Sequence, residues 1–72
     1  MARKTLARPF PARLRELRKS RDMTLVELAE RCGGVPTVSS ISEYERGQKQ
    51  PTLSALQSLA KGLGITVGEL VD

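Results

Sequence analysis

Residues 24–47 read TLVELAERCGGVPTVSSISEYERG and decide the fold. Thr24 followed by Glu27 matches a capping box, in which the hydroxyl and the carboxylate each satisfy a backbone N–H at a helix start. Apolar side chains then recur at helical spacing on one face as far as Cys32. A glycine pair ends that helix, since glycine adopts the left-handed backbone without steric cost. The stretch therefore predicts a capped helix, a turn and a second helix that ends at Gly47.

The second helix is expected over about residues 38–46, with Thr37 as its N-cap. Ser40 stands three residues before a glutamate and is an alternative cap, which would shorten the helix by one turn. Ile41 and Tyr44 are its expected buried positions, because they lie on one side of a helix.

Helical periodicity recurs in three further segments, each with a start signal of its own. They are expected at about residues 12–21 after Pro11, from a cap at Thr52 to Gly64, and from a capping box at Thr66 and Glu69 through Leu70. The middle one directs inward Leu53, Leu56, Leu59, Ala60 and Leu63. No segment carries a strand pattern, so the sequence predicts an all-α, compact five-helix bundle.

Composition excludes several classes of protein. The chain has 72 residues, enough for one domain, with one cysteine and no histidine. No disulfide can form within it, and the usual zinc ligands are missing. No apolar stretch reaches the roughly 20 residues of a membrane span, and no apolar segment follows the basic N-terminus as in a secretory signal. We therefore expect a cytoplasmic protein without metal, cofactor or small-molecule ligand, and no catalytic residues, since nothing combines a nucleophile with a base.

Positive charge is concentrated at the N-terminus. Residues 1–21 hold eight Lys/Arg and one acid, whereas residues 22–72 hold four Lys/Arg and seven acids. A basic front end indicates a polyanionic partner, the alternative being a solvated helix face with a disordered tail. Residues 1–10 are interpreted as a flexible basic arm ahead of a domain at 11–72. The arm carries three cations, Arg3, Lys4 and Arg8. They either contact the minor groove or the phosphates of DNA, or belong to a disordered end with no specific role.

The surface of the expected 38–46 helix suits base recognition. Ser39, Ser40 and Ser42 carry short hydroxyls that let a helix backbone approach base edges. Glu43 can accept from the amino group of cytosine, and Val38 can touch a thymine methyl group. The alternative is an ordinary solvated face, although serine is a poor helix former and three in one helix need a reason.

Five stretches, taken in order, resemble the phage repressor and Cro-type helix-turn-helix family, also called XRE-type. They are LRELR at 14–18, TLVELAE at 24–30, ISEYERG at 41–47, PTLSAL at 51–56 and LAKGLGI at 59–65. The resemblance extends over about four-fifths of the chain. It implies a lambda repressor-like DNA-binding domain that binds double-stranded operator DNA, usually as a homodimer. We therefore expect a transcriptional regulator, with repression as the expected mode.

The resemblance also implies roles for individual residues. The base-reading positions are Thr37, Val38, Ser39, Ser40 and Glu43, and the phosphate-binding positions are Thr24, Arg46, Lys49 and Gln50. Arg18 and Glu45 match positions that form a buried ion pair in the family, the alternative being two surface charges.

Two departures from the family pattern stand out. Leu25 occupies the position where the family commonly has a glutamine that bonds the DNA backbone, and the turn at 33–37 is about two residues longer than usual. The alternative function is a protein-interaction module of the same fold, such as an antitoxin or bridging factor. The last helix, with Ile65, Val67, Leu70 and Val71, either presents an apolar patch to a twin or closes the core. A place at the bacterial or phage nucleoid follows from the DNA-binding interpretation.

Overall fold

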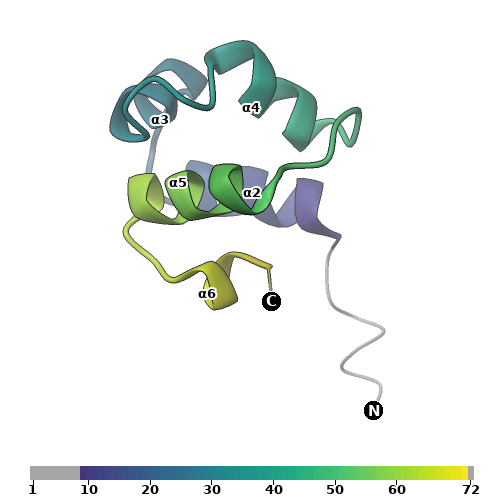
Figure 1. Cartoon of the computed structure of the whole chain (residues 1–72). Coiled ribbons are helices and arrows are strands. Elements are labelled where there is room, and N and C mark those ends of the chain that lie inside the picture. Colours follow the sequence, from purple (N-terminus) through teal and green to yellow (C-terminus); the bar gives the residue numbers. More distant parts are fainter. Residues whose placement is uncertain (1–8, 72) are drawn as a thin grey trace.

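The structure, a computed structural model, describes residues 9–71, which form five helices and no strand (Figure 1). The helices are α2 (Phe10–Lys19), α3 (Leu25–Arg31), α4 (Val38–Glu45), α5 (Leu53–Leu63) and α6 (Val67–Val71). The all-α bundle predicted from the sequence is confirmed. In Figure 1, α3 and α4 lie at the top of the molecule and α6 at the bottom, with α2 and α5 between them. Within residues 9–71, no helix combines the length and apolar composition needed to cross a bilayer.

Threonine side chains cap four of the helices, as the sequence predicts. At α3, the Thr24 hydroxyl accepts from the Glu27 N–H at 3.0 Å, and the Glu27 carboxylate accepts from the Thr24 N–H at 2.8 Å. Thr66 and Glu69 form the same reciprocal box ahead of α6. At α4, the hydroxyl of Thr37 accepts from the backbone N–H of residue 40 at 3.2 Å, so Thr37 and not the alternative Ser40 is the cap. Thr52 caps α5.

Two expectations about helix bounds and burial were wrong. Helix α2 begins at Phe10, because Pro9 is its extended N-cap and Pro11 fits inside the first turn, where no N–H is needed. Leu53 was expected to point inward but is 65% exposed. It begins α5, whereas the buried residues of that helix lie in its second half. Leu53 is thus exposed because it lies more than one turn before the first buried residue of α5, Leu59.

Each helix contributes one fully buried side chain to a single core. These are Leu14, Leu28, Ile41, Leu59 and Leu70, taken from α2 to α6 in order. Leu70 has no exposed surface, so α6 closes the core, while its neighbour Val71 is 51% exposed. The short C-terminal helix is therefore a structural part of the bundle that also leaves apolar surface in solvent.

Gly62 lets α5 pack closely against α3. A Cβ atom placed there would lie 2.9 Å from the Cys32 sulfur and 3.2 Å from Leu28 Cδ1, closer than packed carbon atoms approach. Burial raises the pKa of the Cys32 thiol, which favours its uncharged form. Glycine lowers the helix propensity of α5 at this position, but it permits the close contact between the two helices.

Candidate nucleic-acid interface

Helix α4 has a buried side and a polar side. Ile41 and Tyr44 are buried, and Thr37, Val38 and Ser39 at the start of the helix are exposed. The polar side continues through positions 43 and 46, four and seven residues after Ser39, which places all three on one face of the helix. Helix α4 lies at the far end of the molecule from α6 (Figure 1). The serine-bearing face is therefore open to a large partner.

Lys49, in the loop after α4, folds back against that helix. Its ammonium group donates to the Ser40 hydroxyl at 3.3 Å and lies 3.8 Å from a Glu43 carboxylate oxygen. The same nitrogen is 6.0 Å from the centre of the Tyr44 ring. Ser40 is half-buried as a result of its place on this flank, and Gln50 is exposed in the loop. Lys49, a predicted phosphate contact, thus touches two residues that are predicted to contact bases.

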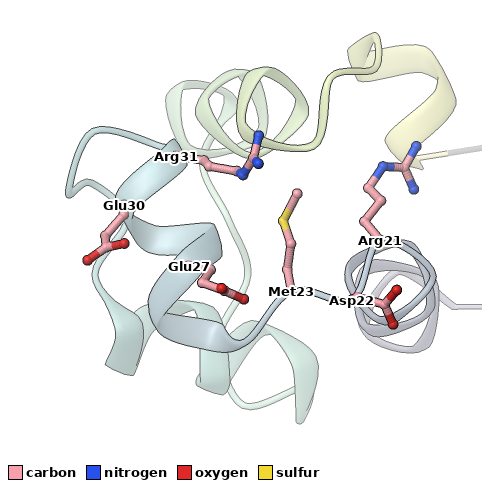
Figure 2. A pocket seen from close by; sticks show the side chains of 6 residues that line it. All are labelled: Arg21, Asp22, Met23, Glu27, Glu30 and Arg31. Atoms are coloured by element: carbon pink, nitrogen blue, oxygen red, sulfur yellow. The ribbon is translucent and has the colours of Figure 1, made fainter.

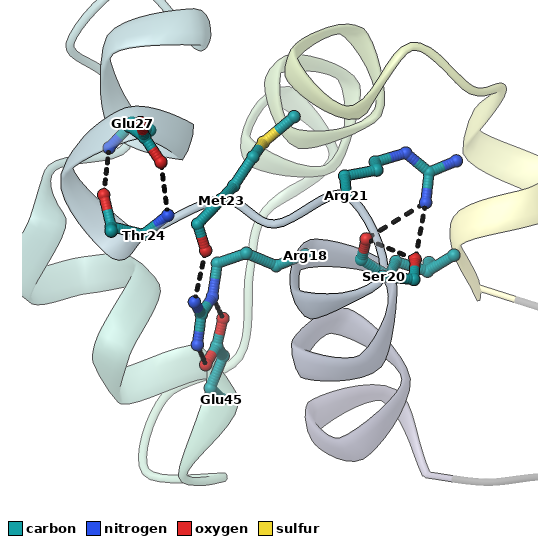
Figure 3. A network of polar contacts seen from close by, with 8 residues as sticks. Arg18, Ser20, Arg21, Met23, Thr24, Glu27 and Glu45 are labelled. Carbon is teal, nitrogen blue, oxygen red and sulfur yellow. Dashed lines mark hydrogen bonds and ion pairs between the residues drawn. The ribbon is translucent and has the colours of Figure 1, made fainter.

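A bidentate ion pair joins α2 to the end of α4. Arg18 Nε donates to Glu45 at 2.7 Å and a terminal nitrogen donates to its other carboxylate oxygen at 2.9 Å (Figure 3). The remaining terminal nitrogen donates to the Met23 carbonyl at 2.7 Å. The hydrogen bond to Glu45 raises the pKa of Arg18 against the opposing effect of burial. With side chains 10% and 7% exposed, the pair is buried and fixes how α4 is held against α2.

Two further arginines of the basic segment bond to backbone carbonyls inside the molecule. Arg13 donates twice to the Glu69 carbonyl, at 2.7 and 3.2 Å. Arg21, in the turn after α2, donates to the Leu63 carbonyl at the end of α5 at 3.0 Å and to the Leu17 carbonyl of α2 at 3.0 Å. Charge counted along the sequence gives no sign of these partners, which lie far away in the chain. The basic segment is therefore partly a set of structural ties and only partly a free cationic surface.

A shallow hollow of about 440 Å³ lies where α2 turns into α3 (Figure 2). Its lining consists of Arg21, Asp22, Met23, Glu27, Glu30 and Arg31. Figure 2 shows Met23 between the two arginines, with Glu30 directed outward. Arg21 is bonded to the carbonyls of Leu63 and Leu17. Glu27 serves in the helix cap, as Figure 3 also shows. The lining carries charges of both signs, and two of its side chains already bond within the protein. We therefore do not interpret this hollow as an anion site.

A different hollow, of about 660 Å³, gathers positive charge beside the end of α4. Arg15 and Lys19 on α2 line it together with Arg46, which follows α4 directly. All three are exposed. Two acids also line it: Glu45, which is neutralised by the buried arginine of α2, and Glu16, so the three cations outnumber the remaining acid. Of these three cations, only Arg46 was predicted to contact phosphate. The predicted Arg18–Glu45 pair already implied that α2 adjoins the end of α4, but it did not show which other side chains of α2 face Arg46.

The predicted residues of the basic arm, Arg3, Lys4 and Arg8, lie outside the described residues. Thr24 is exposed at the start of α3, and its hydroxyl oxygen is used in the cap while its O–H remains a donor. Helix α3 contacts α4, and the turn between them sets the spacing of the two helix starts. Two short helices in this order and contact are the arrangement that many DNA-binding domains use.

A sequence profile described as helix-turn-helix matches residues 14–70. The chain belongs to the helix-turn-helix family. The match contains all five family-like stretches and none of the basic arm. It ends inside α6. The resemblance to the phage repressor family is confirmed by the relatives as well.

Three relatives of this helix-turn-helix protein are regulators or repressors by name. The HTH-type transcriptional regulator DdrOP3 of Deinococcus deserti is 43% identical over 60 residues, which are 83% of this chain and 45% of that protein. The immunity repressor protein of Bacillus phage phi105 is 37% identical over 82% of this chain and 40% of its own length. The cryptic phage CTXphi transcriptional repressor RstR of Vibrio cholerae is 36% identical over 88% and 55%. The chain spans about half the length of these relatives.

The two departures from the family pattern have structural counterparts. Leu25 is half-buried and packs against the core, so the side chain at this helix-turn-helix position serves packing. In the longer turn, Gly33 and Gly34 have φ of 82° and 92°, a left-handed backbone that favours glycine. Pro36, after a cis peptide bond, is buried, whereas Val35 is 72% exposed.

Proposed function

We propose that this chain is a sequence-specific double-stranded DNA-binding regulator, a repressor, that reads the major groove with α4. The observation that carries the proposal is the exposed polar face of α4, held in place by the buried Arg18–Glu45 pair and by contacts with α2 and α3. The major groove of B-DNA is wide enough to admit an α-helix. The names of its relatives support the same function.

Base reading falls to the first turns of α4. Thr37 and Ser39 offer hydroxyls, Val38 offers a methyl surface for thymine, and Glu43 offers an acceptor for cytosine. Ser40 contributes from the flank of the helix, next to Lys49. These side chains distinguish base pairs by their donor, acceptor and methyl patterns, so each is expected to affect preference at one position.

Phosphate contacts hold the domain in register on the duplex. Arg46 lies at the end of α4, and Arg15 and Lys19 extend its positive surface along α2. Thr24 can donate its O–H to a phosphate while it caps α3. Gln50 is exposed in the following loop. The basic arm, with Arg3, Lys4 and Arg8, would add contacts in the minor groove.

We further propose that two copies bind a two-fold operator at the bacterial or phage nucleoid. Helix-turn-helix dimers place their reading helices about one helical turn, or roughly 10 bp, apart. A hollow of about 310 Å³ between the start of α2, the loop after α4 and the end of α6 supports a contact between copies. Its apolar lining includes Phe10, Leu56 and Val71, and Lys49 and Gln50 of the loop stand at its polar edge. Sedimentation of the free and DNA-bound chain tests this state directly, with a 2:1 protein-to-duplex complex expected.

The experiment that tests DNA binding is a salt titration of affinity for labelled duplex. DNA binding predicts that log K falls linearly with log salt, with a slope of about −0.9 for each phosphate contact. Arg46→Ala is expected to reduce the slope by about one contact and to weaken binding to all sequences equally. Lys61→Ala, an equal loss of charge on the exposed part of α5, is the matched control. A flat salt response, or no binding, would reject the proposal.

A protein-interaction module of the same fold is the second candidate. Leu25 packs against the core instead of offering an amide to the DNA backbone, and Leu53 is 65% exposed. An antitoxin or bridging factor would use such apolar surface for its partner. It would leave the affinity for duplex DNA weak and unchanged by Glu43→Ala, which separates the two functions.

A further inference from the structure

The contacts of Lys49 link a predicted phosphate-binding residue to the reading face of α4. Its ammonium group is held at one place by three neighbours: the Ser40 hydroxyl at 3.3 Å, a Glu43 carboxylate oxygen at 3.8 Å and the Tyr44 ring at 6.0 Å. Glu43 lies on the exposed polar face, and Tyr44 anchors the opposite side in the core. Lys49 therefore lies at the edge of the reading face.

The pair remains accessible to a partner. The side chains of Lys49 and Glu43 are 50% and 42% exposed. An ammonium group has three donors, of which one bonds Ser40, while the Glu43 oxygen at 3.8 Å lies at ion-pair distance and beyond a hydrogen bond. A carboxylate has two oxygens, and only one of them lies against Lys49. At least one donor and one acceptor, side by side, are thus left for a ligand.

That arrangement matches the major-groove edge of one base pair. Cytosine presents its N4 amino donor directly beside the O6 acceptor of its paired guanine, and guanine N7 follows as a second acceptor. A carboxylate next to an ammonium group offers the complementary acceptor and donor. Resting on the proposed DNA-binding function, we propose that Glu43 and Lys49 act as one unit that reads a C·G base pair, Glu43 on cytosine N4 and Lys49 on guanine O6 and N7.

The alternative base pairs satisfy this unit less well. In A·T the amino donor lies between two separate acceptors, so an ammonium group on one side of the carboxylate reaches only one of them. In a G·C pair, where the two bases are exchanged, the Glu43 carboxylate would face guanine O6. Both groups are acceptors, so they would repel each other. Lys49 is therefore a specificity-determining residue, and its contribution differs from that of a phosphate contact, which carries no sequence information.

The pair is dispensable for folding, which makes it suitable for substitution. Exposed ion pairs contribute little to stability because water and salt screen them. Lys49→Met keeps the length of the side chain and removes its donors, and Lys49→Arg keeps charge and donors. Lys61→Met on α5 removes the same charge away from the reading face and is the matched control. Circular dichroism of each variant establishes that it is folded.

The test is selection of bound sequences from a random duplex pool by the full chain and its variants. The wild-type chain and Lys61→Met are expected to select C·G at one position of each half-site, and Lys49→Met to lose about tenfold of that preference while other positions stay unchanged. Lys49→Arg, which can bond guanine, retains it. Glu43→Gln is expected to move the same position toward A·T, because glutamine pairs with adenine N6 and N7.

Two results would overturn the pairing, and a third would overturn the function beneath it. If Lys49→Met weakens binding to all sequences equally and lowers the salt slope by about one contact, Lys49 binds phosphate alone. If the preference lost with Lys49 and the one lost with Glu43 fall at different positions, the two do not read together. If the wild-type chain enriches no sequence and shows no salt-dependent binding, the proposed DNA-binding function itself fails.

Discussion

Replacing Arg18 by methionine probes the contact that sets the position of α4. The change removes two bonds to Glu45 and one to the Met23 carbonyl, and it leaves a carboxylate that is only 7% exposed without its cation. Loss of one partner of a buried ion pair costs about 3–5 kcal/mol. A domain of 72 residues has a free energy of unfolding of about 4–11 kcal/mol at the usual contribution per residue. Arg18→Met is therefore expected to lose a large part of its stability.

The double variant Arg18→Met/Glu45→Leu separates the pair from the cost of an orphaned charge. Apolar replacements of buried ion pairs are often neutral, so the double variant is expected to be at least about 2 kcal/mol more stable than Arg18→Met. Urea unfolding followed by far-ultraviolet circular dichroism measures both values at neutral pH. A loss below about 1 kcal/mol for Arg18→Met, as found for exposed pairs, would refute the structural role assigned here.

Other perturbations test the local contacts of the fold. Gly62→Ala is expected to destabilise the fold by about 1–2 kcal/mol, although alanine favours helix, because its Cβ would meet the Cys32 sulfur at 2.9 Å. Thermal unfolding should show that stability recovers when Cys32→Ala is added. Equal stability of all variants would contradict the close packing. Thr37→Ala should cost about 1 kcal/mol through loss of the α4 cap, whereas a neutral result in urea unfolding would show that the cap contributes nothing. Hydrogen bonds from the Thr66 backbone and hydroxyl lower the pKa of Glu69 below its ordinary value. Its stabilisation of α6 is therefore present above the ordinary pKa and is lost as the pH falls through the lowered pKa, which amide shifts in an NMR titration would follow; an unshifted Glu69 titration would contradict the cap.

Local cap chemistry made most of the fold predictable from the sequence. Hydroxyl caps such as Thr24 and Thr37 act within three residues, so their signal stands complete in a short stretch of chain. The ion pair between Arg18 and Glu45 followed from a family resemblance, and the structure forms it. Periodicity alone identified the buried Ile41 and Tyr44 but misplaced Leu53, because a helical stripe indicates which side faces inward and not how far along the helix the core extends.

Contacts over long sequence separations could not be predicted. Arg13 and Arg21 were counted as free positive charge, yet their acceptors are backbone carbonyls 56 and 42 residues away. Nothing in the sequence links Gly62 to the Cys32 sulfur that lies against it. The approach of Lys49 to Glu43 likewise depends on how the loop after α4 folds back. The roles assigned to individual residues on DNA stay predictions.

Cross-saturation from DNA protons to the amide protons of the chain, in a complex with a duplex obtained by selection, tests the placement of α4 most directly. This measurement reports direct contact, so it separates DNA from any contact between two copies of the chain. Signal loss is expected at the start of α4, from Thr37 to Ser40, and at Thr24 and Arg46, with α6 unaffected. Signal loss centred on α6 and the start of α5, with α4 untouched, would contradict the claim that α4 reads the major groove.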